Sequence, residues 1–148
     1  MSILGQTVEN AGASLFADLS GSNFAPGTNI LLFTLNVGQG GPNGTRNQNW
    51  RFITVNAALN HYKIQSVLTG LYASVGNAAA GQAVVSSLTP FTWQVTVVDT
   101  FSHNSVVRVP NTNLVWSVPA GSRATTNVTI AAATNNNLNQ QWRIRNVV

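Results

Sequence analysis

The chain has 148 residues, enough for one domain with a proper core, and only 7% of them are charged, against about 25% in an ordinary globular protein. The formal net charge is +4, but the seven Lys and Arg residues are spread along the chain, which disfavours a nucleic-acid-binding function. The chain has no cysteine, and its first ten residues lack the pattern of a signal peptide, so we expect a cytoplasmic location.

Short apolar segments separated by turn residues run through the whole chain, and no long helical periodicity interrupts them. This pattern, with roughly a dozen strands, predicts an all-β sandwich or barrel. The first strand, within 6–12, is poorly defined because it lacks an apolar and aromatic start. The clearest predicted strands are 30–35, 50–55, 62–67, 71–75, 82–86, 93–98, 106–109, 114–118, 127–131 and 142–147.

Two short patterns recur three times along the chain. The first reads LFADL from Leu15, LYASV from Leu71 and LVWSV from Leu114, with a polar residue at the fourth place. The second is a Trp that opens an apolar strand, at Trp50, Trp93 and Trp142. Gln precedes this Trp by two residues in the first and third copies, and Phe takes that place in the second.

The three copies, roughly 6–56, 57–99 and 100–148, are each too small to bury a core alone. Packed around a pseudo-threefold axis they would form one β-trefoil domain, with the three repeated Trp residues meeting inside. A β-propeller needs at least four blades, so three repeats argue against it. Trp116 lies outside the repeated pattern, and the sequence leaves open whether it belongs to the core or to the surface.

The threefold Gln-x-Trp pattern resembles that of the ricin B-chain-like lectins, especially the small cysteine-free mushroom lectins. The resemblance covers nearly the whole chain. It implies a β-trefoil that binds glycans ending in galactose or N-acetylgalactosamine, with a role in fungal defence. It also implies a homodimer as a route to avidity, although nothing in the sequence identifies an interface.

Each lobe of this family can carry one sugar site, built from an Asp, an aromatic residue some fifteen positions later and the Asn of Asn-Gln-x-Trp. The first copy holds the whole set, because Asp18 and Phe33 are fifteen residues apart and Asn47 precedes Gln48. A carboxylate accepts hydrogen bonds from two sugar hydroxyls, and an aromatic face packs on the C–H face of the ring. The carbohydrate-binding residues predicted by this resemblance are Asp18, Gly21, Phe33, Asn36, Arg46, Asn47 and Gln48.

Within this set, Gln48 is expected to brace the turn rather than to touch the sugar. The long loop 38–44 is expected to add contacts or to close over the site. The second copy has Ser74 in place of Asp, Ser near the aromatic position and Phe in place of Gln. The third copy keeps Asn139 and Gln140 but has Ser117 in place of Asp, and Ala131 or Ala132 near the aromatic position. We therefore predict one sugar per chain.

Other interpretations of these residues are weighed against the lectin hypothesis. Asp18 could serve only to hold a turn. An enzyme is disfavoured because glycoside hydrolysis usually needs two close carboxylates, whereas Glu9, Asp18 and Asp99 lie in different repeats or in the poorly defined first segment. His61 and His103 have no neighbouring Cys or second acid, so neither a metal site nor a catalytic dyad is expected, and no cofactor is implied.

A β-trefoil protease inhibitor is the alternative function, because loops 38–44 and 100–105 could enter a protease cleft. A structural or nucleic-acid-binding module is a third hypothesis. The sequence does not choose among glycan contexts beyond a galactose-type terminus.

Overall fold

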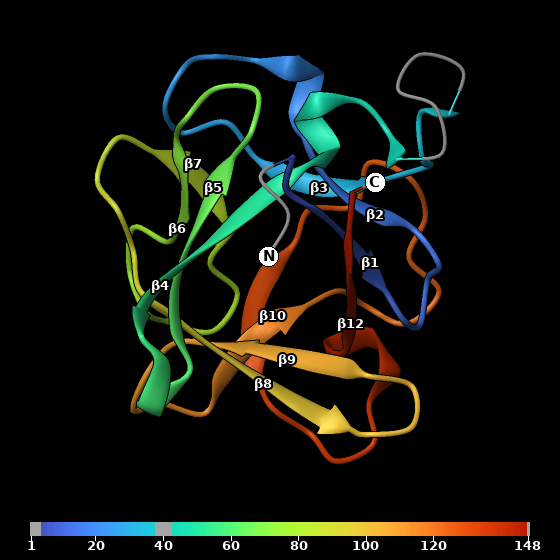
Figure 1. Ribbon diagram of the computed structural model, residues 1–148. Helices are drawn as coiled ribbons and strands as arrows, with labels where there is room; N and C mark the ends of the chain where they lie inside the picture. Colours follow the sequence, from blue (N-terminus) through green and yellow to red (C-terminus); the bar gives the residue numbers. More distant parts are fainter. Residues whose placement is uncertain (1–3, 38–42, 148) are drawn as a thin grey trace.

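The computed structural model describes residues 4–37 and 43–147 (Figure 1). These residues form twelve short strands, as expected for an all-β chain. In chain order the strands are β1 (Gln6–Asn10), β2 (Phe16–Leu19), β3 (Ile30–Phe33), β4 (Trp50–Asn56), β5 (His61–Ser66), β6 (Tyr72–Ser74), β7 (Val85–Ser87), β8 (Trp93–Asp99), β9 (Asn104–Arg108), β10 (Leu114–Ser117), β11 (Thr129–Ala132) and β12 (Trp142–Asn146).

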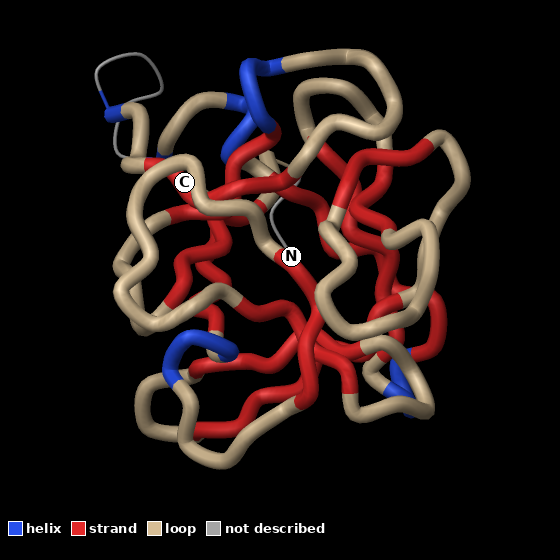
Figure 2. Tube along the Cα trace, turned by 180° about the vertical axis from the view of Figure 1, so that it is seen from behind, coloured by secondary structure: helices blue, strands red, loops and turns tan. Residues whose placement is uncertain are grey.

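Six of the strands close into a barrel in which β1 pairs with β4, β4 with β5, β5 with β8, β8 with β9, β9 with β12 and β12 with β1. The other six form three hairpins, β2–β3, β6–β7 and β10–β11, attached to β1, β5 and β9. Long loops link these strands (Figure 2). Each third of the chain thus supplies four strands, and we call the thirds β1–β4, β5–β8 and β9–β12 the first, second and third lobes.

Two sets of hydrogen bonds repeat around the axis of the barrel. In the first set, Ile30 N donates to Val84 O, Val84 N to Val128 O and Val128 N to Ile30 O, over 2.9–3.0 Å. In the second, the indole nitrogen of each repeated Trp donates to a carbonyl of its own lobe, at Ala17, Ala73 and Trp116. These carbonyls lie at matching places in the first sequence repeat, so the pseudo-threefold symmetry is confirmed in atomic detail.

All four Trp side chains are buried in the core. Trp116 is fully buried and makes edge-to-face contacts with Trp93 and Trp142, at centroid distances of 5.5 and 5.7 Å. It occupies the place taken by Ala17 and Ala73 in the other lobes. The sequence left open whether Trp116 lies in the core or on the surface, and the structure places it in the core.

The strand boundaries differ from those expected in a few places. The segment 6–12, poorly defined by sequence, contains β1, a regular strand that pairs with β12 over five residues and is mostly buried. Four short 3₁₀ helices also occur within the described residues, at Ser20–Ser22 (η1), Arg46–Gln48 (η3), Ala57–Leu59 (η4) and Leu138–Gln140 (η5). No helix in the described part of the chain is long and apolar enough to cross a membrane.

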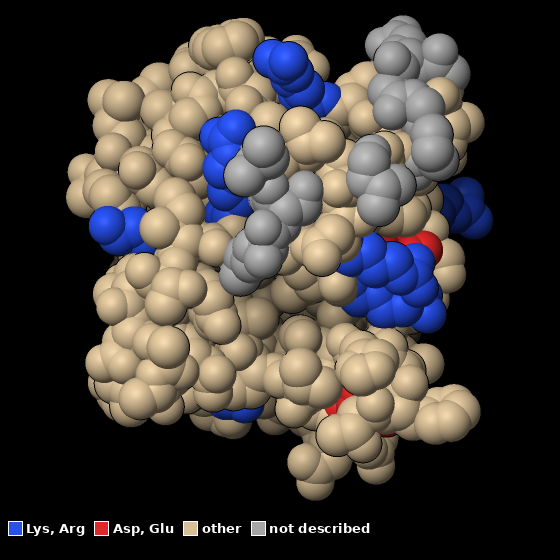
Figure 3. Space-filling view, viewed as in Figure 1, with Lys and Arg blue, Asp and Glu red and all other residues tan. Residues whose placement is uncertain are grey.

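The basic residues are dispersed over the surface, as Figure 3 shows for one face. Arg143 and Arg145 lie two apart on β12, and both pair with Glu9, at 3.0 and 3.3 Å. A single carboxylate on β1 therefore partly neutralises the one local pair of arginines. This arrangement gives no support to a nucleic-acid-binding surface.

Candidate functional site

The hairpin β2–β3 positions the key acidic residue. Side chains alternate across a strand, so Ala17 and Leu19 enter the core while Asp18 points to the opposite face. The register pairs Asp18 with Leu31 and places Phe33 two residues further along β3, on the same face. The fifteen-residue spacing seen in the sequence thus follows from the hairpin, which brings Asp18 and Phe33 side by side.

The carboxylate of Asp18 is held by two side-chain amides from η3. Asn47 Nδ2 donates to Oδ1 at 3.0 Å, and Gln48 Nε2 donates to Oδ2 at 2.8 Å. These partners lie some thirty residues away in the sequence, so Asp18 does not simply hold its own turn. Each carboxylate oxygen has a second lone pair, which leaves both oxygens able to accept a further hydrogen bond.

Burial raises the pKa of Asp18 to about 6, because the carboxylate loses water, while the hydrogen bonds from Gln48 and Asn47 lower the pKa and offset part of this effect. Only 4% of the residue is exposed. The carboxylate is therefore ionised at neutral pH and gains a proton in mildly acidic solution.

Gln48 braces this arrangement without being exposed itself. Its Nε2 also donates to Thr34 O at 2.9 Å, and its Oε1 accepts from Asn36 N at 3.0 Å. The second amide is fixed in a similar way, because Asn47 Oδ1 accepts a hydrogen bond from Thr45 Oγ1. Since both amide oxygens are occupied by donors, both NH2 groups must face Asp18.

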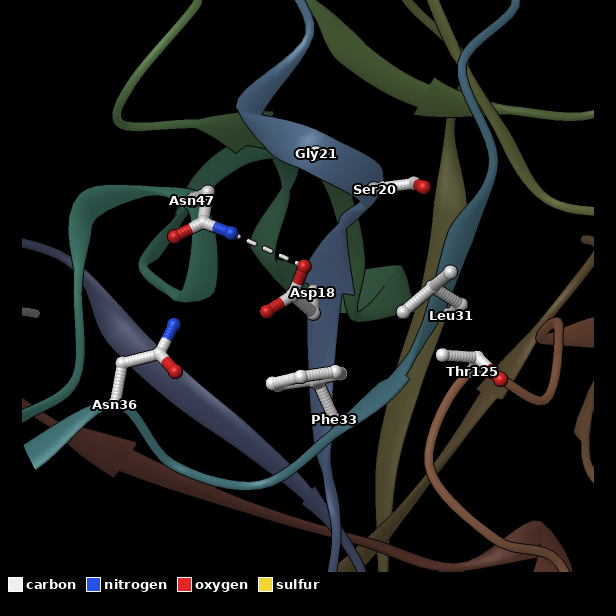
Figure 4. A pocket seen from close by; sticks show the side chains of 8 residues that line it. All are labelled: Asp18, Ser20, Gly21, Leu31, Phe33, Asn36, Asn47 and Thr125. Atoms are coloured by element: carbon white, nitrogen blue, oxygen red, sulfur yellow. Dashed lines mark hydrogen bonds between the residues drawn. The ribbon is translucent and has the colours of Figure 1, made fainter.

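A pocket of about 280 Å³ opens over these groups (Figure 4). Phe33 is 37% exposed and its ring lies beside the Asp18 carboxylate, while Asn36 and Asn47 lie to the left of this carboxylate in Figure 4. Gly21 adopts a left-handed conformation, with φ of +61°, and a Cβ there would meet no atom within 4 Å. The pocket is lined by Asp18, Ser20, Gly21, Leu31, Phe33, Asn36, Asn47 and Thr125.

Five of the seven residues predicted from the sequence line this pocket, and Gln48 lies directly behind Asp18. Arg46 is the exception, because its side chain is exposed and it is not among the lining residues. The contacts predicted for loop 38–44 fall largely on 38–42, which lie outside the described residues. Asn43, at the end of this loop, accepts a hydrogen bond from Asn49 Nδ2 at its carbonyl, at 2.8 Å.

Three lining residues were missed by the sequence analysis. Leu31 lies opposite Asp18 in the hairpin, and Ser20 follows two residues after Asp18. A predicted hairpin register would have found both. Thr125 belongs to the third lobe, and its N–H donates to Leu32 O at 2.7 Å. No sequence signal marks it, because the contact arises only when the lobes pack around the axis.

A family model for the ricin-type β-trefoil lectin domain-like family matches residues 46–132, more than half of the chain. The chain belongs to this ricin-type β-trefoil lectin family. Among curated protein sequences, no match to the chain is found.

Several solved structures share the fold of this chain. The designed threefold-symmetric protein ThreeFoil is 19% identical, with a TM-score of 0.81 over 96% of this chain and 98% of that one. The ricin B-like lectin of Macrolepiota procera, solved in complex with lactose, is 22% identical, with a TM-score of 0.79 over 98% and 97%. The Rhizoctonia solani agglutinin is 22% identical, with a TM-score of 0.80 over 97% and 95%.

The three lobes of this ricin-type trefoil can be aligned by strand register. Because Ala17 pairs with Leu32 and Trp116 with Ile130, Phe33 corresponds to Ala131 in the third lobe. In the second lobe the same position is Ser87, which pairs with Tyr72. Neither of these lobes therefore places an aromatic ring where Phe33 stands.

The brace itself recurs in the third lobe. Gln140 Nε2 donates to Ala132 O at 2.9 Å, and its Oε1 accepts from Thr134 N at 2.8 Å, as Gln48 does with Thr34 and Asn36. In place of the carboxylate, Gln140 meets the hydroxyl of Ser117 at 3.4 Å. In the second lobe, Phe91 stands at the Gln position and packs on Trp93, with ring centroids 4.6 Å apart.

The three carboxylates of the ricin-type trefoil lie in separate places. Asp18 faces the pocket, Glu9 pairs with arginines on β12, and Asp99 holds the exposed turn of loop 100–105 through Phe101 N and Ser102. The hydrogen bonds from Ser102 and Phe101 lower the pKa of Asp99. Within the described residues, no group of three or more His, Cys, Asp or Glu side chains could hold a metal ion.

Proposed function

We propose that this protein is a lectin that binds one sugar per chain, through the pocket on the first lobe. The observation that carries the proposal is the fixed carboxylate of Asp18, whose two oxygens are each held by one amide and can each accept one further hydrogen bond. Two neighbouring sugar hydroxyls match this pair of acceptors. Charge-assisted hydrogen bonds of this kind are stronger than neutral ones.

The preferred ligand in this proposal is a glycan ending in galactose or N-acetylgalactosamine. Such sugars have one face of C–H groups, which would pack on the half-exposed ring of Phe33 while the hydroxyls face Asp18 and Asn47. The Macrolepiota procera lectin is solved with lactose, and an earthworm R-type lectin of the same fold is solved with N-acetylgalactosamine. These structures support the sugar class and leave the specificity of this chain as a proposal.

Binding without catalysis is part of the proposal. One carboxylate lines the pocket, and the other two of the chain are engaged elsewhere in an ion pair and in a turn. A glycosidase usually needs two carboxyl groups on either side of the bond that it cleaves. Fungal defence, a cytoplasmic location and a homodimer that raises avidity stay predictions from the family resemblance.

A glycan array with the wild type and Asp18→Asn tests the proposal. The substitution keeps the size of the side chain, removes its charge and turns one acceptor into a donor that faces the NH2 of Asn47 or Gln48. We expect wild-type binding to galactose- or N-acetylgalactosamine-terminated glycans, and loss of this binding in the variant. Equal binding by both proteins would remove the assigned site, and a wild type that binds no glycan would remove the lectin function.

The same proteins address the protease-inhibitor alternative. Loop 100–105 ends in an exposed turn, but nothing in its structure favours a protease over other partners, and residues 38–42 lie outside the described residues. Inhibition of papain or trypsin at micromolar protein, unaffected by Asp18→Asn, would support the inhibitor instead. We expect neither protease to be inhibited.

A further inference from the structure

A second pocket, of about 470 Å³, is formed by the barrel strands, opens to solvent beside the exposed residues Asn60 and Val97, and shares no residue with the pocket on the first lobe. All six barrel strands contribute to it, and none of the three hairpins does. The lining residues are Gln6, Phe52, Asn60, Tyr62, Val95, Thr96, Val97, Ser105 and Ile144. We call this cavity the axial pocket.

Six of these residues form two rings around the pseudo-threefold axis. Gln6, Tyr62 and Ser105 are equivalent, because they pair in register with the three repeated Trp residues of β4, β8 and β12. Phe52, Val95 and Ile144 are also equivalent, because each follows its Trp by two residues on the same strand face. The axial pocket is thus a solvent-accessible place where strands of all three lobes meet.

The size of the cavity follows from unequal side chains within each ring. Phe52 and Tyr62 are large and touch edge to face, at a centroid distance of 6.3 Å. Their counterparts Val95 and Ser105, on β8 and β9, are much smaller. The side chains of the two rings therefore leave more space on the β8–β9 side than on the β4–β5 side.

Gln6 gives the axial pocket an unsatisfied polar group. The side chain lines the pocket, the residue is 6% exposed, and its Oε1 has no hydrogen-bond partner. A buried carbonyl oxygen without a hydrogen-bond partner is unfavourable, because it has lost its contact with water. A ligand hydroxyl could remove this cost after a small turn of the amide, and it would suit either end of the amide because it both donates and accepts.

We propose that the axial pocket binds a small uncharged molecule with an aromatic or alicyclic body and one hydroxyl group. The body packs against Phe52, Tyr62 and Ile144, and the hydroxyl bonds to Gln6. The pocket favours an uncharged ligand over an ionised one, because no charged side chain is among the residues that line it. This site is independent of the proposed sugar site.

Equilibrium dialysis of the full chain against 2-naphthol and against 2-methylnaphthalene tests the proposal. The two molecules have nearly the same shape, and only 2-naphthol carries a hydroxyl. We expect the wild type to bind 2-naphthol about 5–10-fold more tightly, as one hydrogen bond of about 1–1.5 kcal/mol predicts. Gln6→Met keeps the length of the side chain but removes its amide. This variant should therefore bind the two molecules with about equal affinity.

The double variant Val95→Phe and Ser105→Tyr is the filling control, because it places in β8 and β9 the residues that already stand at the equivalent positions of β4 and β5. We expect this double variant to bind neither 2-naphthol nor 2-methylnaphthalene. We also expect its circular dichroism spectrum to show a folded protein, even if Gln6→Met does not fold. Asp18→Asn should bind 2-naphthol like the wild type. The proposal is overturned if the wild type binds neither molecule, if it shows no preference for 2-naphthol, or if the filled variant still binds.

Discussion

The first and third lobes share one framework and differ in the side chains that it presents. In both lobes, the side-chain oxygen of a Gln accepts a hydrogen bond from a backbone N–H in the loop after the hairpin. The NH2 group of the same Gln donates a hydrogen bond to a carbonyl at the end of the hairpin. In the first lobe this Gln also donates to the carboxylate of Asp18, and in the third to the hydroxyl of Ser117. The repeated brace is therefore a structural feature, and in the proposed function it is the Asp18 and Phe33 positions that make the first lobe suited to a sugar.

The second lobe sharpens this comparison. Its Phe91 replaces the braced Gln and packs on Trp93 instead, yet the hairpin β6–β7 still forms and Trp93 still donates to Ala73 O. The fold thus tolerates loss of the brace when an apolar contact takes its place. A polar brace is needed where it faces a buried carboxylate.

Asp18→Ser should have the largest effect on binding, because it gives the first lobe the residue found at this position in the other two. We expect sugar affinity to fall about 100-fold through loss of two charge-assisted hydrogen bonds, with little change in folding. Titration calorimetry with a methyl galactoside measures the loss. Ser117→Ala is the matched control and should leave affinity unchanged, and a drop of less than about threefold in Asp18→Ser would contradict the assignment.

Gln48→Met and Gln140→Met compare the two braces directly. Gln48→Met leaves Asp18 Oδ2 and Thr34 O without their donor, so we expect the free energy of unfolding to fall by about 2–4 kcal/mol. Gln140→Met also loses the bonds to Ala132 O and from Thr134 N, but its third bond is a long one to a neutral hydroxyl, so the fall should be about 1–2 kcal/mol. Urea unfolding at pH 7 measures both, and equal losses would show that the carboxylate adds nothing to the brace.

The raised pKa of Asp18 predicts how binding depends on pH. A neutral sugar needs the ionised carboxylate, so affinity should fall as the pH drops below about 6, by about tenfold at pH 5 relative to pH 8. Stability should show the opposite sign. Because the folded pKa lies above the usual value of 3.8, the ionised form is less favourable when folded, and this group's contribution to stability rises as the pH falls from about 6 to 4.

Calorimetry from pH 5 to pH 8 checks the pH dependence of binding. Asp18→Ser supplies the reference for stability, which should lack the rise below pH 6. An affinity that is flat over this range would mean that the carboxylate does not contact the ligand.

Phe33→Ala gives the first lobe the side chain of Ala131, its counterpart in the third. Loss of the ring should weaken sugar binding about 5–10-fold, since the aromatic contact is the smaller part of the site. Phe33→Trp is the informative partner, because a wider ring at the same half-exposed place should bind at least as tightly as the wild type. If both variants bind like the wild type, the sugar does not pack on this residue.

The fold was predictable because it repeats. Three Trp residues open apolar strands, and Gln stands two residues before two of them. This pattern predicts the trefoil and the positions of the three barrel strands that begin with these Trp residues. The strand β1 was poorly defined by the sequence because its residues, including Gln6 and Asn10, are polar although buried, and pairing with β12 decides their conformation. Trp116 could not be assigned because its burial depends on Trp93 and Trp142, which are distant in sequence.

The candidate site was predicted from the family resemblance, which rests on short local patterns in the sequence. Asp18 and Phe33 belong to one hairpin, and Asn47 and Gln48 precede a repeated Trp. The pKa of Asp18 was not predictable, because it depends on burial that only the packed structure defines. Thr125 was not predictable either, since it reaches the pocket across a contact between lobes.

The central claim is that one lobe binds sugar because one lobe carries the carboxylate, and side-chain amide NMR tests it most directly. In an ¹⁵N-labelled protein, the NH2 signals of Asn47 and Gln48 report on the first lobe, and those of Asn139 and Gln140 on the third. Titration with methyl β-galactoside should shift the first pair and leave the second in place. Shifts of the third-lobe pair, or of neither pair at saturating sugar, would contradict the account.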